Sequence, residues 1–137
     1  MATTYDEFCA VAAELIADES CAESRARAAV SRAYYGMYHA IQPVVDGLPV
    51  IHRSVGESVG HHRDAIDRLA KWDCPLKDLR YPAAAMSKAL AYARTLRNRA
   101  DYELGQNVSR VDAEAVLERA KRAIRFAQTV TQARAAA

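Results

Sequence analysis

Residues that break helices are scarce in this sequence, whose 137 residues include five glycines and four prolines. Alanine, the strongest helix former, accounts for 29 residues. No apolar run approaches the roughly 18–20 residues that a membrane-spanning helix requires. The N-terminus also lacks a basic segment followed by an apolar one, so we expect no signal peptide. These absences predict an all-α protein of the cytoplasm that does not enter a membrane.

Cysteine and excess charge of one sign are also scarce. Cys9, Cys21 and Cys74 are scattered without a C-x-x-C spacing, which indicates reduced thiols rather than a disulfide framework or a zinc site. Nineteen basic against 17 acidic residues leave a net charge of +2. This balance excludes a histone-like polycation but allows a local basic groove. Glycine-rich phosphate loops and the GxSxG and HExxH motifs are absent, and we expect neither a metal nor a cofactor.

Apolar residues at helical spacing predict five helices in a single domain covering residues 1–137. The expected helices cover about 5–18, 20–45, 58–71, 82–105 and 109–130. Since most of the connections between them are short, neighbouring helices should run antiparallel. The fold class predicted is therefore all-α, a four- to five-helix up-and-down antiparallel bundle.

Specific residues mark the expected helix ends. The pairs Thr4/Glu7, Ser20/Glu23 and Ser109/Asp112 fit capping boxes at the starts of the first, second and fifth helices. Pro43 is expected to end or disrupt the second helix, Pro82 to begin the fourth and Gly105 to stop it. In the short third helix, Val59, Ile66 and Leu69 are expected to face the core.

The first chemistry-bearing segment is residues 31–40, SRAYYGMYHA. Arg32, Tyr35 and His39 are spaced three and four residues apart, so they share one face of a helix. Two interpretations remain open. The tyrosines are either core residues whose hydroxyls reach polar partners, or, with Arg32 and His39, parts of a binding site.

The second such segment is residues 94–105, RTLRNRADYELG, at the end of the fourth helix. Arg97 and Asp101 are four residues apart and can pair. An acid in the last helical turn is unfavourable without a cation nearby, because that end of the helix carries partial negative charge. Either Arg97, Arg99 and Asp101 form a structural ion network, or Arg94, Arg97 and Arg99 form a site for a phosphate group.

Together the two segments resemble the HEPN superfamily (higher eukaryotes and prokaryotes nucleotide-binding), most closely its small stand-alone prokaryotic branch. That branch often has an AYYA-M/F-HA helix, here residues 33–40, and an R-x-x-A-D-Y motif, here residues 97–102. It also has a histidine that opens the third helix, here His61 or His62. The resemblance implies a helical bundle, usually a homodimer, and covers most of the chain.

The resemblance further implies a site at the dimer cleft. Many HEPN proteins are metal-independent ribonucleases in which an arginine holds the scissile phosphate and a histidine moves a proton at the ribose 2′-hydroxyl. Some act as the toxin partner of a minimal nucleotidyltransferase. On this basis the candidate catalytic residues are Arg97, Asp101 and Tyr102. The candidate phosphate- or nucleotide-binding residues are Arg94, Arg99, Asn98, Arg32, Tyr35 and His39.

One departure from the family pattern keeps a second function open. In the ribonuclease signature, four to six residues separate the arginine from a histidine. In this sequence the corresponding positions after Arg97 hold Tyr102, Glu103 and Leu104. Tyrosine, with a pKa near 10, is a poor base at neutral pH. The alternatives are a non-catalytic helical module that binds a nucleotidyltransferase-type protein, and a bundle that has lost its site.

The fifth helix carries a further group of basic residues. Arg119, Lys121, Arg122 and Arg125 recur along it. They are interpreted first as a solvated surface, and alternatively as a basic groove extending toward RNA.

Overall fold

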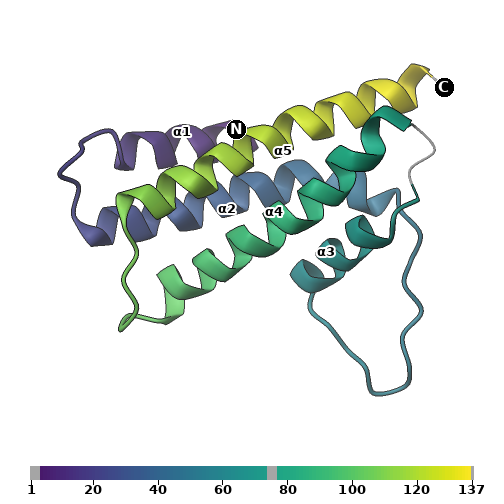
Figure 1. Ribbon diagram of the computed structural model, residues 1–137, viewed down its shortest axis with the longest axis horizontal. Helices are drawn as coiled ribbons and strands as arrows, with labels where there is room; N and C mark the ends of the chain where they lie inside the picture. Colours follow the sequence, from purple (N-terminus) through teal and green to yellow (C-terminus); the bar gives the residue numbers. More distant parts are fainter. Residues whose placement is uncertain (1–3, 74–76, 137) are drawn as a thin grey trace.

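The computed structural model describes residues 4–73 and 77–136, and within them it contains five helices and no strand. The helices are α1 (Tyr5–Leu15), α2 (Glu23–Asp46), α3 (His61–Lys71), α4 (Lys77–Tyr102) and α5 (Arg110–Ala136). The long helices alternate in direction, and the short α3 lies beside α4 (Figure 1). The predicted all-α bundle is confirmed. No helix in the described part of the chain has the length and apolar character needed to cross a membrane.

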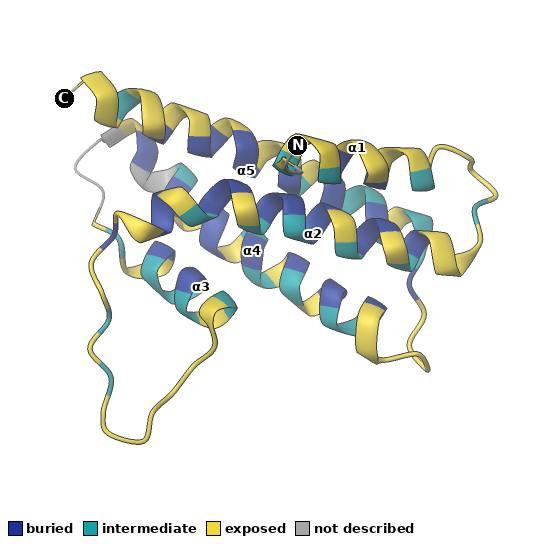
Figure 2. Ribbon diagram, turned by 180° about the vertical axis from the view of Figure 1, so that it is seen from behind, coloured by how far each residue is buried: buried dark blue, intermediate teal, exposed yellow. Residues whose placement is uncertain are grey.

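Helix α2 is the centre of the bundle, because it contacts each of the other four helices. Figure 2 shows a run of buried residues along it. Many inner positions are alanines, which lets the helix axes approach one another closely. Fully buried alanines occur on α1, α2, α4 and α5: Ala12, Ala33, Ala93, Ala113, Ala120 and Ala123. Since these side chains carry no rotamer entropy, their burial orders the helices at little cost.

The closest approach of α1 and α2 occurs at Gly36. A Cβ atom added there would lie 3.0 Å from Cys9 Sγ, 3.0 Å from the Tyr5 carbonyl oxygen and 3.2 Å from Phe8 Cβ. The glycine therefore permits a contact between helix backbones that any larger side chain would prevent. Gly36 lies inside the SRAYYGMYHA segment. That segment therefore contributes to helix packing in addition to carrying polar side chains.

Two of the three predicted helix caps are present. Thr4 Oγ1 accepts a hydrogen bond from the Glu7 amide (3.4 Å), and Ser109 and Asp112 bond each other's amides reciprocally (3.1 and 2.9 Å). The cap predicted at Ser20 is wrong, because α2 begins at Glu23 with Ala22 as its N-cap.

The carboxylate of Glu23 has other partners. It accepts hydrogen bonds from the Val108 amide (3.1 Å) and from Arg27 Nη2 (2.9 Å). Glu23 therefore links the start of α2 to the segment that precedes α5.

Helix α2 ends at Asp46, one residue beyond the predicted end and less than one turn after Pro43. The predicted start of the fourth helix at Pro82 was wrong, because α4 begins at Lys77. In both helices the residues near the proline are held by packing, since Val44, Val45 and Leu79 are buried. A proline costs one hydrogen bond, and burial of these apolar side chains offsets that loss.

Helices α3 and α4 are shorter at one end than predicted. Helix α3 begins at His61 rather than near Ser58, and Val59 is exposed rather than inward-facing, whereas Leu69 is buried and Ile66 packs on the core. Helix α4 ends at Tyr102, before Gly105. Cys9 and Cys21 are free thiols, and Cys74 lies outside the described residues.

The end of α4 is held by Arg27 of α2, which sequence reasoning did not identify. Its Nη1 donates to the carbonyl oxygens of Arg99 (2.9 Å) and Ala100 (3.1 Å). Its guanidinium also donates to the carbonyl oxygens of Glu103, Leu104 and Gln106. The last carbonyls of a helix have no partner within the helix. A guanidinium satisfies them and also complements the negative end of the helix dipole.

Candidate functional site

Arg97 is the centre of the candidate site. Within the described ranges, Ser87 and Arg97 are the buried polar or charged residues, and Arg97 is only 8% exposed. It lies on the inner face of α4, among apolar residues of the same face, Ala93, Leu96 and Ala100. A buried guanidinium needs partners that satisfy its five N–H groups. The groups around Arg97 therefore decide whether its guanidinium is fully paired or can bind a ligand.

Aromatic rings from α2 and α4 surround the Arg97 guanidinium. Its Cζ lies 5.4 Å from the ring centre of Tyr34, 5.3 Å from that of Tyr35 and 5.8 Å from that of Tyr102. Nη2 donates to the Tyr35 hydroxyl (3.1 Å), and Nη1 donates to Asn98 Oδ1 (3.0 Å). The rings stabilise the positive charge through their negative faces.

The guanidinium retains donors for another group. Arg97 Nε is buried without a hydrogen-bond partner, and it lies 3.8 Å from Asp101 Oδ2, which is too far for a hydrogen bond. Asp101 instead accepts a hydrogen bond from Ser31 Oγ (3.3 Å). The predicted Arg97–Asp101 pair is thus present as a weak ion pair, and part of the Arg97 charge is unmatched.

His62, at the start of α3, reaches the same group of rings. Its Nδ1 lies 2.5 Å from the Tyr34 hydroxyl, and its ring centre lies 4.3 Å from that of Tyr38 and 6.3 Å from that of Tyr35. We call Arg97, Tyr34, Tyr35, Tyr38 and His62 the Arg97 cluster. It joins α2, α3 and α4, although its members come from three distant parts of the sequence.

The cluster shifts two proton equilibria. Burial lowers the pKa of His62, and the positive charges of Arg97 and Arg94 lower it further. Burial also raises the pKa of Tyr34 well above its ordinary value, against the opposing effect of Arg97. At neutral pH His62 is therefore uncharged and Tyr34 keeps its proton. An uncharged imidazole can accept a proton, which a tyrosine at this site cannot.

The predicted residues around the cluster are divided between three places. Tyr102 is exposed at the rim, and His39 is exposed with its ring stacked on Phe8 at 5.6 Å. Arg99 is half-buried, and its carbonyl oxygen, rather than its side chain, makes the contact to Arg27. Arg32 lies elsewhere, beside α1, where it lines a hollow of about 330 Å³ with Glu7, Phe8 and Val11. Of the predicted shared face, the structure brings together the rings of Tyr35 and His39, whose centres lie 6.3 Å apart. Arg32 and His39 both lie beside Phe8 of α1.

Arg94 and Asn98 border a separate hollow between α3 and α4. Its volume is about 310 Å³, and its polar lining also includes Arg63 and Asp67. Asn98 belongs to both places, because its Oδ1 accepts a hydrogen bond from Arg97 and the residue also lines the hollow. This hollow is the open surface closest in structure to the buried guanidinium. Its two arginines suit an anionic ligand.

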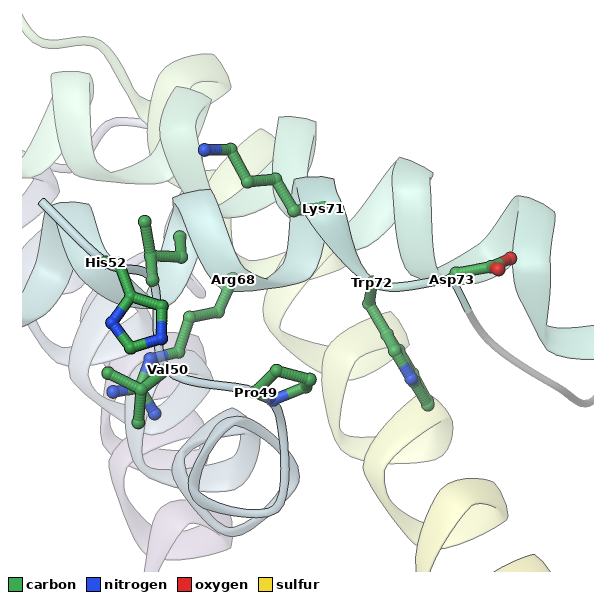
Figure 3. Close-up of a pocket in the computed structure, with 8 residues that line it drawn as sticks. Pro49, Val50, His52, Arg68, Lys71, Trp72 and Asp73 are labelled. Carbon is green, nitrogen blue, oxygen red and sulfur yellow. The ribbon is translucent and has the colours of Figure 1, made fainter.

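Another hollow, of about 460 Å³, lies between the chain that follows α2 and the end of α3 (Figure 3). Pro49, Val50, Ile51 and Trp72 give it an apolar lining. Arg68 contributes charge but already pairs with Asp64 at 2.9 Å. None of the lining residues belongs to the Arg97 cluster, so we do not place the function there.

The residues described include no group of three or more His, Cys, Asp or Glu side chains arranged to hold a metal ion. Comparison with known proteins found no match among family models, curated proteins or solved structures. The fold and the cluster therefore define the protein as an all-helical bundle with a buried Arg–Tyr–His centre. Its function has to be argued from that centre.

Sequence reasoning identified Arg97, Asn98 and Tyr35 correctly as neighbours but missed Tyr34 and Tyr38 and left His61 and His62 equivalent. Helical geometry separates the two histidines, since adjacent residues point about 100° apart. His61 is exposed and His62 is half-buried. The available signal was the amphipathic pattern of α3, in which His62 shares a face with Ile66 and Leu69.

Proposed function

We propose that this protein is a HEPN-like, metal-independent ribonuclease of the cytoplasm that binds an RNA or nucleotide phosphate through Arg97 at a homodimer cleft. In this proposal it acts as a toxin or defence component. The observation that carries the proposal is the position of His62 beside Tyr34 and Tyr35, which themselves contact Arg97. In this proposal, His62 of α3 takes the role of the histidine that is missing after Arg97 in the sequence.

Arg97 and His62 have different roles in the proposed cleavage of RNA. In this proposal, the N–H groups of Arg97 Nη1 and Nη2 that Asn98 and Tyr35 leave free hold a phosphate oxygen. When the Tyr34 hydroxyl oxygen accepts a hydrogen bond from the Nδ1–H group of His62, the imidazole lone pair is on Nε2. That nitrogen can then take the proton of a ribose 2′-hydroxyl, whose oxygen attacks the neighbouring phosphorus. The bond from phosphorus to the 5′-oxygen of the next nucleotide breaks, which leaves a 2′,3′-cyclic phosphate and a 5′-oxygen that takes a proton from water. A lowered pKa keeps His62 in the uncharged form that this step requires.

Exposed apolar side chains next to the cluster support the dimer. Tyr102 is 73% exposed and Leu104 is 80% exposed, and both lie at the end of α4. Large apolar residues grouped on a surface are typical of an interface. A second copy packed there would cover Tyr102 and enclose Arg97.

The test is cleavage of a labelled single-stranded RNA in the presence of EDTA. Wild type is expected to cleave, and His62→Gln to lose about 100-fold or more of the rate, the usual scale for loss of a general base. Arg97→Lys retains the charge but loses the forked donors, and it should lose cleavage too. His61→Gln is the matched control, because His61 is adjacent and exposed. Wild type that neither binds nor cleaves RNA would refute the proposal.

A second candidate function is a non-catalytic module that binds a nucleotidyltransferase-type protein. The observation that favours it is the burial of Arg97 between tyrosine rings, which is how a structural arginine is held. In that case Arg97→Met should lower the free energy of unfolding while wild type shows no affinity for RNA. Circular dichroism and RNA binding measured on the same samples distinguish the two candidates.

A further inference from the structure

A second basic surface lies on the other side of α4, in the groove between α4 and α5. It has a volume of about 440 Å³. Its charged lining consists of Lys88 from α4 and Arg119 and Arg122 from α5. Ala85, Met86 and Ala89 contribute its apolar lining. The two helices pack directly against each other along it (Figure 1).

The cations of this groove lack acidic partners among the described residues. Elsewhere on the surface, arginines pair with acids: Arg53 with Asp64 and Asp67, and Arg110 with Glu114. No ion pair is formed by Lys88, Arg119 or Arg122, and the groove lining contains no acid. Glu118, one turn before Arg122, contacts Lys121 instead (3.4 Å). Positive charge is thus concentrated in a concave surface, where it attracts anions most strongly.

An aromatic ring lies among these cations. Tyr92 is 37% exposed, and the Cζ of Arg119 lies 3.9 Å from its ring centre. Arg119 Nη1 donates to the Ala115 carbonyl oxygen (3.0 Å), so only the remaining N–H groups of its guanidinium are available to a phosphate. The exposed part of the Tyr92 ring offers a surface for a planar group. A basic groove with an aromatic platform is the arrangement that binds single-stranded nucleic acid, in which cations hold phosphates and rings stack on bases.

We propose that the groove between α4 and α5 binds the sugar–phosphate backbone of single-stranded RNA, with Tyr92 stacking against a base. Taking RNA as the ligand rests on the proposed function, but the groove shares no residue with the Arg97 cluster. Helix α4 also places Arg94 and Asn98 beside α3. From Lys88 to Asn98 the helix rises about 15 Å. A strand held in the groove can therefore cross the exposed ridge of α4 toward the α3 side.

The test is the salt dependence of binding of a fluorescein-labelled oligouridylate, measured by anisotropy. Lys88→Gln and Arg122→Gln should each weaken binding and reduce the slope of log affinity against log salt by about 0.7. Lys121→Gln is the matched control, because it removes the same charge from an exposed position of α5 that lies outside the groove. Tyr92→Leu should weaken binding several-fold and leave the slope unchanged, since stacking releases no counterions.

Three results would overturn the inference. Equal weakening by Lys121→Gln would mean that net charge, not the groove, attracts RNA. Groove variants that lose affinity for polyglutamate but not for RNA would indicate an acidic protein as the partner. Wild type that does not bind the oligonucleotide would also refute it. Groove-dependent binding without any cleavage would instead uphold this inference while the ribonuclease proposal fails.

Discussion

The hydroxyl oxygen of Tyr34 lies 2.5 Å from Nδ1 of His62, and this contact joins α2 to α3. Tyr34 itself is fully buried. The hydrogen bond fixes which nitrogen of His62 faces outward, and the buried ring supports the guanidinium of Arg97 at 5.4 Å. One tyrosine therefore both orients the imidazole and contacts the arginine of the candidate site.

Tyr34→Phe should remove the hydrogen bond while the ring still fills its space. We expect a loss of about 0.5–1.5 kcal/mol in the free energy of unfolding, the usual net value of one hydrogen bond. Urea denaturation measures it. Tyr38→Phe serves as control, since no hydrogen bond of the Tyr38 hydroxyl is present in the described structure. An equal effect of both substitutions would contradict the role assigned to Tyr34.

The stability of the fold should depend on pH through His62. Its pKa is lowered in the folded protein, mainly by burial, so the unfolded chain binds a proton more readily, with a pKa of about 6.5. The stabilisation is complete above that value and is lost as the pH falls through about 6.5 toward the folded pKa. Chemical denaturation between neutral and mildly acidic pH should show this loss, and His62→Gln should reduce it. An unchanged pH profile in that variant would show that another group is responsible.

Gly36→Ala should destabilise the bundle. The new methyl group would lie 3.0 Å from Cys9 Sγ and from the Tyr5 carbonyl oxygen, so α1 and α2 must separate, at a cost of about 1–3 kcal/mol. Gly105→Ala is the control, because a Cβ there meets nothing within 4 Å. Thermal unfolding of the two variants compares them. A Gly36→Ala protein as stable as wild type would mean that the helices are not held this closely.

Arg27→Met should release the end of α4. The substitution keeps an apolar stem but removes donors to the Arg99 and Ala100 carbonyl oxygens, and we expect a loss of about 1.5–3 kcal/mol. Hydrogen exchange should accelerate over residues 99–106 in particular. Arg32→Met, at an exposed position of the same helix, should change neither quantity. Uniform acceleration across the chain would argue against a local cap.

The proposed dimer can be tested at Leu104, which is 80% exposed. Leu104→Asp should shift sedimentation toward the monomer, because an interface does not accept an unpaired charge. Val55→Asp, at an exposed site in the loop before α3, is the control. A wild-type protein that sediments as a monomer at all concentrations would refute the dimer directly.

The sequence by itself determined the helical class and most of the helix faces. Alanine content and apolar spacing act locally along the chain, so five helices in an antiparallel bundle could be inferred without coordinates. Ser109 and Asp112 likewise indicated the start of α5 correctly, since a capping box involves only residues within one turn. The boundary at Pro82 was misplaced because packing of distant helices outweighed a local preference.

Only the tertiary structure decided which polar side chains meet. Arg97 and Asn98 are sequence neighbours, but His62 and Tyr34 come together because α3 folds back beside α4 and α2. Arg27 reaches the end of α4 because α2 and α4 pack against each other. No sequence pattern in the loop between α2 and α3 sets the direction in which the chain enters α3. The burial of the apolar faces of α3 and α4 sets that direction instead. That packing, rather than any motif, brings an uncharged histidine beside a buried arginine.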